Sequence, residues 1–335
     1  MHLLLRFKQI FSENQIMVVL LGIVAGLVFP KFFRPIAPYG TYLLILIFFA
    51  SSLRLNVYEI ISYAKDWKMM LLTNLFMLVF LPLLLWAPCA AFAPDWAMAF
   101  LIMGAMPTGM TIALIADLFG GRTTLALVIT ATTSLLAPFT IPLIFWLVIG
   151  QAVPVPVFTM FFNLVITIVL PFVAAAIVQR KAPNIVKHYD FWWREISIVA
   201  FGVLIAAIVG DTTGSGPIIL TVRDVGLVIV MLIYTAGLIA LSYFMTFWRT
   251  NSEKATIALC MVYLNNTLAL FIANRYFPNP KLMTQLVILL LVINVLLPPF
   301  RWIAAYAVSL DEKKKGRKKS VRSTKSIRSI RSRRG

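Results

Sequence analysis

"GAMPTGMTIALIADLFGG", residues 104–121, decides the fold, because it places Pro107, Thr108 and Gly109 inside a long apolar run. Proline removes a backbone donor and clashes with the preceding turn, and glycine relaxes the chain. A helix through this stretch is therefore predicted to break near residue 107. Such a break exposes amide and carbonyl groups, which cost free energy in hydrocarbon unless they meet a partner or a cavity.

The composition around this stretch is that of an integral membrane protein. Of 335 residues, 61% are hydrophobic and 13% are charged, and the mean hydropathy is +0.92; a soluble domain carries about 25% charged residues. Ten apolar runs are long enough to span a bilayer, and all are predicted to be helices because lipid offers an open backbone no partner. They cover residues 16–33, 37–53, 68–92, 96–119, 123–150, 154–179, 192–210, 225–248, 255–276 and 282–309.

Lys and Arg are unequally divided between the two sets of loops. If both ends are cytoplasmic, residues 1–15 and the inner loops carry twelve of them, and the outer loops carry five. Cytoplasmic loops are enriched in these residues, so we expect an inner-membrane protein with both termini inside the cell. Residues 310–335 hold most of the net charge of +18. They are predicted to form a disordered cytoplasmic tail held near anionic lipid, with no nucleic-acid partner, because no nucleic-acid-binding fold accompanies the charge.

The ten runs divide into two halves of five, residues 16–150 and 151–309. "SLLAPFTIP" at 134–142 and "NVLLPPFRW" at 294–302 share a pattern at an offset of about 160 residues. An odd number of spans reverses the orientation of the second half, so the halves are predicted to be inverted repeats. The expected fold is all-α, with ten transmembrane helices.

The fourth span of each half carries a polar interruption. The repeat offset brings residues 107–109 next to "NNT" at 265–267 in the ninth run. The helix N-terminus at such a break offers N–H groups to an anion, and the opposite end offers carbonyl groups to a cation. Asparagine amides add further donors. We expect one central substrate site lined by Thr108, Gly109, Asn265, Asn266 and Thr267, with Thr130 and Asn294 nearby. The alternative is a kinked helix whose polar groups satisfy one another within a packed bundle.

Four motifs resemble a known family in their order and spacing. They are "FFASSLRL" at 48–55, "MPTGMT" at 106–111, "SLLAPFTIP" and "NNTLAL" at 265–270. Together they resemble the bile acid:sodium symporter superfamily over residues 10–309. The resemblance implies a panel domain, a core domain in which segments four and nine cross at their breaks, and transport of organic anions by alternating access.

The family's ion ligands are largely missing from this sequence. Its sodium-binding Ser-Asn pair falls on Ile112 and Ala113, its segment-nine carboxylate falls on Met261, and a serine position reads Ala126. A hard cation needs several oxygens, preferably with a negative charge among them. We therefore expect transport that does not require sodium.

Three residues are the remaining candidates for ion coupling: Thr130 and Asn265 as oxygen ligands, and Asp117 as a proton-titrating acid. The alternative role for Asp117 is to cap the cytoplasmic end of segment four. A uniporter without a coupling ion is equally allowed.

Other classes of function fit less well. His2 and His188 lie outside the spans and carboxylates are nearly absent within them, which argues against an enzyme, and no cofactor or metal is expected. Paired asparagines also suit an efflux permease for metalloid oxyanions, but no cysteine stands beside Pro107. A non-transporting sensor or scaffold would tolerate the missing ion ligands. The expected function is secondary transport of a small organic anion.

Overall fold

The computed structural model describes most of the apolar part of the chain. The described residues are 15–54, 66–109, 112, 115–116, 121–150, 154–215, 222–296, 299–300, 302–303, 305–306 and 309. The predicted tail at 310–335 and the candidate Asp117 lie outside them.

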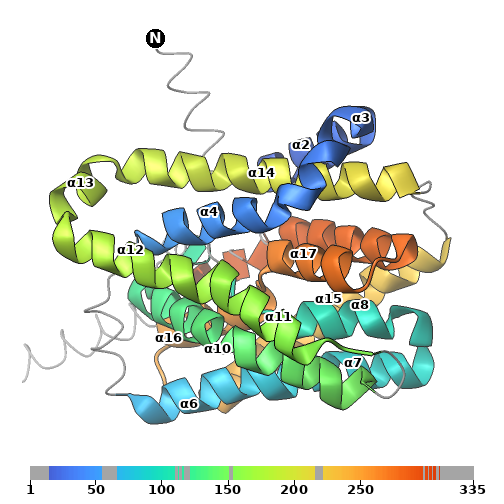
Figure 1. Cartoon of the computed structure of the whole chain (residues 1–335). Coiled ribbons are helices and arrows are strands. Elements are labelled where there is room, and N and C mark those ends of the chain that lie inside the picture. The colour runs from blue at the N-terminus through green and yellow to red at the C-terminus, as the bar shows by residue number, and fades with distance from the viewer. Residues whose placement is uncertain are drawn as a thin grey trace, which may run out of the picture.

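The described residues are almost entirely helical (Figure 1). In the first half of the chain the helices are α2 (Gln15–Val28), α3 (Pro30–Phe33), the 3-10 helix η1 (Arg34–Tyr39), α4 (Gly40–Ser52), α6 (Trp67–Leu75), the π-helix η2 (Phe76–Phe80), α7 (Leu81–Phe92), α8 (Pro94–Gly104) and α10 (Thr123–Ile149). In the second half they are α11 (Val157–Leu164), the π-helix η3 (Val165–Val169), α12 (Leu170–Lys181), α13 (Pro183–His188), α14 (Asp190–Ser215), α15 (Val222–Met245), α16 (Asn251–Val262) and α17 (Asn266–Tyr276), followed by a helix at Pro280–Leu296.

Within the described part of the chain, six helical segments are long and apolar enough to cross a membrane. They are Pro30–Ser52, Trp67–Phe92, Thr123–Ile149, Val157–Lys181, Asp190–Thr213 and Val225–Met245. The prediction of an all-helical membrane protein is therefore confirmed. The fourth and ninth apolar runs do not meet this length, because α8, α16 and α17 have only 11 or 12 residues each. Each extends for about 17 Å at 1.5 Å per residue, roughly half of a hydrocarbon core about 30 Å thick.

Two π-helical turns, η2 and η3, are features that the apolar pattern did not predict. Each is followed by a Leu-Pro pair, Leu81-Pro82 or Leu170-Pro171. The leucine amide donates to a carbonyl five residues back, Phe76 in the first case and Val165 in the second. The proline that follows has no N–H and cannot form the usual helical bond to the carbonyl four residues back. The π turn before it lets the helix continue past the proline.

The helices pack in two groups. In the first, α14 packs against α2, α3, η1 and α4, and α12 packs against α4; in the second, α7 packs against α8, α16 against α10 and α15, and α17 against α8. Figure 1 shows α14 and α4 running across the top of the view, with α6, α7 and α10 below. The two groups meet where α10 contacts α11 and where α17 contacts α14.

Small residues allow the close packing of α2 on α14. A Cβ added at Gly22 would lie 2.8 Å from the Gly202 carbonyl oxygen, and one at Gly26 would lie 2.6 Å from that of Ala206. Backbones of membrane helices approach this closely only where side chains are small.

Candidate functional site

The break predicted near residue 107 is present. Helix α8 ends at Gly104, and the Met106 amide donates to the Met103 carbonyl only three residues back, at 3.2 Å. Pro107 cannot donate to that carbonyl, and its ring disfavours a helical conformation at the preceding residue. The chain therefore leaves the helix and runs extended through Thr108 and Gly109.

A second break separates α16 from α17, and the two breaks cross each other. Thr108 and Leu264 form an antiparallel bridge. The Gly109 amide donates to the Tyr263 carbonyl at 2.9 Å, and the Asn265 amide donates to the Pro107 carbonyl at 2.8 Å. Backbone groups freed by one break are thus satisfied by the other.

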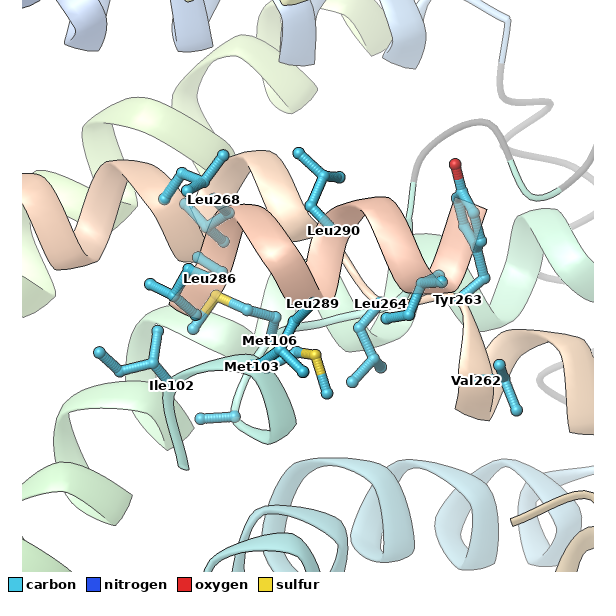
Figure 2. Close-up of a cluster of buried hydrophobic side chains, with 14 of the residues drawn as sticks. Ile102, Met103, Met106, Val262, Tyr263, Leu264, Leu268, Leu286, Leu289 and Leu290 are labelled. Atoms are coloured by element: carbon cyan, nitrogen blue, oxygen red, sulfur yellow. The ribbon is translucent and has the colours of Figure 1, made fainter. Parts of the chain in front are cut away.

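Apolar side chains surround the crossing. Figure 2 shows Met103, Met106, Leu264 and Leu289 gathered beside the two extended segments. All four are at most 2% exposed. An unpaired amide or carbonyl costs several kcal/mol in such apolar surroundings. The two breaks therefore depend on the hydrogen bonds that they form with each other.

Thr108 lies in the core of the crossing. Its side chain is fully buried, and its hydroxyl donates to the Cys260 carbonyl at 3.4 Å and contacts the Met77 sulfur at 3.8 Å. Its amide donates to the Thr133 hydroxyl at 3.3 Å. The sequence placed Thr108 in the lining of the site, whereas in this conformation its hydroxyl is used within the protein.

Three polar residues form the start of α17. The Asn265 side-chain oxygen accepts a hydrogen bond from the Leu268 amide at 3.1 Å, which caps the helix. Asn266 and Thr267 follow in the first turn, and both are about nine-tenths buried. The Asn266 backbone amide donates to the Leu264 carbonyl at 2.9 Å, whereas the Asn266 side-chain amide and the Thr267 hydroxyl have no hydrogen-bond partner among the residues that the structure describes. A helix N-terminus carries partial positive charge, so these groups form a donor-rich surface suited to an anion.

Asn294 reaches the crossing indirectly. Its side-chain oxygen accepts a hydrogen bond from the Tyr263 hydroxyl at 3.3 Å, and its amide donates to the Leu290 carbonyl at 2.8 Å. Tyr263 was not among the predicted site residues, although it is the first residue of the second break. Thr133 and Met77 were also missed. Thr133 lies one turn beyond the predicted Thr130 on α10, and that spacing was the available signal.

The positions at which the resemblance places ion ligands are apolar here. Ile112, Ala126 and Met261 are at most 1% exposed, and none offers a side-chain oxygen. The hydroxyl of Thr130 donates to the Ala126 carbonyl of its own helix at 2.8 Å. Asn265 is occupied as a helix cap, and Asp117 lies outside the described residues.

Comparison with known proteins places the chain in a family. A family model described as the SBF-like CPA transporter family matches residues 13–297. The chain belongs to this family. The family is related to the bile acid:sodium symporters, so the predicted relationship is confirmed. None of the curated proteins compared with the chain matches it. Membership and the apolar helices together indicate an integral membrane transporter.

Gly109 allows the two breaks to approach each other, and replacing it tests the crossing. In Gly109→Ala the new Cβ would lie 2.8 Å from Tyr263 Cδ1 and 3.2 Å from the Tyr263 carbonyl oxygen. We expect the crossing to be destabilised by about 1–3 kcal/mol and the apparent thermal unfolding midpoint in detergent to fall.

Gly237→Ala on α15 is the matched control, because its Cβ would meet nothing within 4 Å. Alanine favours a helix interior over glycine by about 0.5–1 kcal/mol, so this variant should keep or raise the midpoint. Equal midpoints for Gly109→Ala and the unmodified chain would contradict the close approach.

Proposed function

We propose that the protein is a secondary transporter that carries a small organic anion across the inner membrane by alternating access. The observation that carries the proposal is the crossing itself. Two interrupted helices meet in an apolar interior. The first turn of α17 places Asn266 and Thr267 beside the crossing, and their side-chain donor groups have no acceptor among the described residues. A packed kink accounts for the backbone groups, which satisfy one another, but not for these side chains.

The full architecture in the proposal is ten membrane crossings in two inverted repeats, residues 16–150 and 151–309. The hydrogen bonds at the crossing support it, because they are reciprocal: each break donates one amide to the other and accepts one in return. Interruptions at matched positions in two inverted halves produce this kind of two-fold exchange.

The two packing groups correspond in the proposal to a moving core and a panel. The core contains α8, α10, α16 and α17 with the crossing, and the panel contains α2, α4, α11, α12 and α14. Their contacts include one hydrogen bond at 2.8 Å, from the Asn163 amide on α11 to the Tyr276 hydroxyl at the end of α17. Few polar bonds of this kind would have to break for the two groups to slide past each other.

Ion pairs between loops support the proposed topology. Arg54 pairs with Asp190, and Arg249 pairs with Asp66. In the proposed span order all four belong to inner loops. On the other face, Arg34 pairs with Asp211 and Lys281 with Asp95. Each pair joins loops of one side only, and the excess of Lys and Arg assigns the first side, with both termini, to the cytoplasm.

Uptake into proteoliposomes across a panel of small organic anions tests the proposed function. Sodium and proton gradients are imposed separately, and protein-free vesicles serve as the control. Concentrative or exchange flux of one anion class is the expected result. Saturable binding without flux of any anion would contradict the proposal and favour a sensor or scaffold.

The transport should not require sodium. The positions where the resemblance places sodium ligands hold Ile112, Ala126 and Met261, which are buried and apolar. We expect replacement of sodium by choline to leave the initial uptake rate unchanged within about twofold. Loss of flux in choline would contradict this prediction and would show that other oxygens of this chain bind the cation.

Asn266→Ala should weaken substrate binding without unfolding the protein. Loss of a hydrogen bond to a charged ligand costs about 1.5–3 kcal/mol, or roughly ten- to a hundredfold in affinity. Isothermal titration with the transported anion measures the effect.

The exposed Asn184→Ala on α13 is the matched control and should bind as the unmodified chain does. Asn265→Ser keeps an oxygen that can cap α17, so this variant should fold normally. Its affinity for the anion then shows whether the Asn265 side chain contacts the ligand in addition to capping the helix. Unchanged affinity in Asn266→Ala would place the substrate site elsewhere.

A further inference from the structure

An open apolar groove lies away from the crossing, between the third apolar run and α15. It has a volume of about 560 Å³ and is lined by apolar side chains, among them Leu72, Leu75 and Leu84 on the α6–η2–α7 side and Leu241 and Met245 on α15. Pockets of roughly 300–1,000 Å³ are typical of sites for small ligands. Several of the lining residues are exposed at the outer surface of the protein, Leu75 to 45% and Phe80 to 53%.

The groove has the length of one lipid chain. Leu72 and Leu84 are separated by twelve residues, or about 18 Å along a helix at 1.5 Å per residue. One leaflet of a bilayer contributes about 15 Å of hydrocarbon. The two π-turn residues Phe76 and Phe80 lie between them and also line the groove.

Apolar contact alone would not select a particular lipid. Acyl chains are as apolar as leucine, so moving one from the bilayer into the groove brings little hydrophobic free energy. Selectivity has to come from the polar end.

That end of the groove is basic and aromatic. Lys68 lies one turn before Leu72 on α6, and Arg249 follows Met245 by four residues. The ion pair between Arg249 and Asp66 holds the guanidinium at the start of α6, next to the turn that carries Lys68. Trp67 and Trp248 are more than half exposed on the same two segments, as is typical of side chains at the level of the headgroups.

The charge at this end is positive after internal pairing. Asp66 offsets the charge of Arg249, whereas Lys68 lies 5.8 Å from the centre of the Trp67 ring and has no carboxylate partner among the described residues. The Nε of Arg249 is buried and has no hydrogen-bond partner in the described part of the chain. Basic pockets between membrane helices bind anionic headgroups.

We propose that this groove binds one anionic phospholipid, with an acyl chain between α6–α7 and α15 and its phosphate at Lys68 and Arg249. The site is separate from the crossing and does not depend on the transported substrate. The basic tail at 310–335 lies outside the described residues and forms no part of the proposed site.

Native mass spectrometry of the full chain in detergent tests the proposal, with phosphatidylglycerol and phosphatidylcholine of identical chains as probes. The unmodified chain should retain phosphatidylglycerol in preference to phosphatidylcholine. Leu75→Trp fills the groove without changing any charge, so it should lose one bound phosphatidylglycerol even though the tail is intact. Lys68→Gln should lower the preference for phosphatidylglycerol about fivefold, the effect of about 1 kcal/mol for one basic residue near the membrane surface.

Two matched variants serve as controls. Leu143→Trp enlarges an equally exposed leucine on α10, and Lys187→Gln removes an exposed lysine on α13; both should bind lipid as the unmodified chain does. Lipid binding by Leu75→Trp or Lys68→Gln that equals the controls would overturn the proposal. A dimer that dissociates in Leu75→Trp would also overturn it, because a second copy of the chain would then occupy the groove.

Discussion

Hydrocarbon cannot hydrogen-bond an open backbone, and this one constraint governs the interior of the protein. Pro107 and the segment before Asn265 each leave backbone groups unpaired in the middle of an apolar bundle. The structure satisfies them against each other, through the amides of Gly109 and Asn265. The short helices α8, α16 and α17, the close approach at Gly109 and the apolar shell shown in Figure 2 are all consistent with this pairing.

The pairing also explains why the centre is polar at all. A continuous helix through either run would satisfy every backbone group but would offer nothing to a polar solute. Two paired breaks keep the backbone satisfied and at the same time place a helix N-terminus and its side-chain donors deep within the protein. Asn265 is used as the cap, and in the proposed function the side chains of Asn266 and Thr267 meet the ligand. A small anion that brings its own acceptors is the complementary partner for such a surface.

The sequence predicted the all-helical membrane fold and the two breaks because both rest on local chemistry. An apolar run of about 20 residues has one stable form in lipid, and a proline in a helix interior removes a hydrogen bond and favours a kink or a break. The helix ends before Pro107, whereas α10 continues through Pro138 and Pro142. The cap at Asn265 was not predicted, although a short polar side chain before a helix is typical of this role; Asn265 was expected in the substrate site and as an ion ligand. The resemblance to the bile acid:sodium symporter superfamily implied that the two breaks cross. The structure shows which backbone groups join them, the amides of Gly109 and Asn265 and the carbonyls of Tyr263 and Pro107.

Other features depend on tertiary register and were not predictable in this way. The Thr108 hydroxyl turns toward the Cys260 carbonyl instead of an open site, and Asn294 acts through Tyr263. Which of several partners a hydroxyl or amide selects depends on how neighbouring helices are rotated, and apolar patterning does not encode that rotation. The π turns at Leu81 and Leu170 show the same limit, since a Leu-Pro pair is compatible with a kink, a break or a π turn.

The central claim is that the start of α17 is a substrate surface that opens to each side of the membrane in turn. Thiol labelling of Asn266→Cys tests it most directly, in a chain whose two cysteines, Cys89 and Cys260, are replaced by alanine. A membrane-impermeant maleimide is added to one face of oriented vesicles at a time. The account predicts labelling from both faces, slowed from both by the transported anion. A chain that transports but is labelled from neither face, or at a rate that the anion does not change, would contradict it.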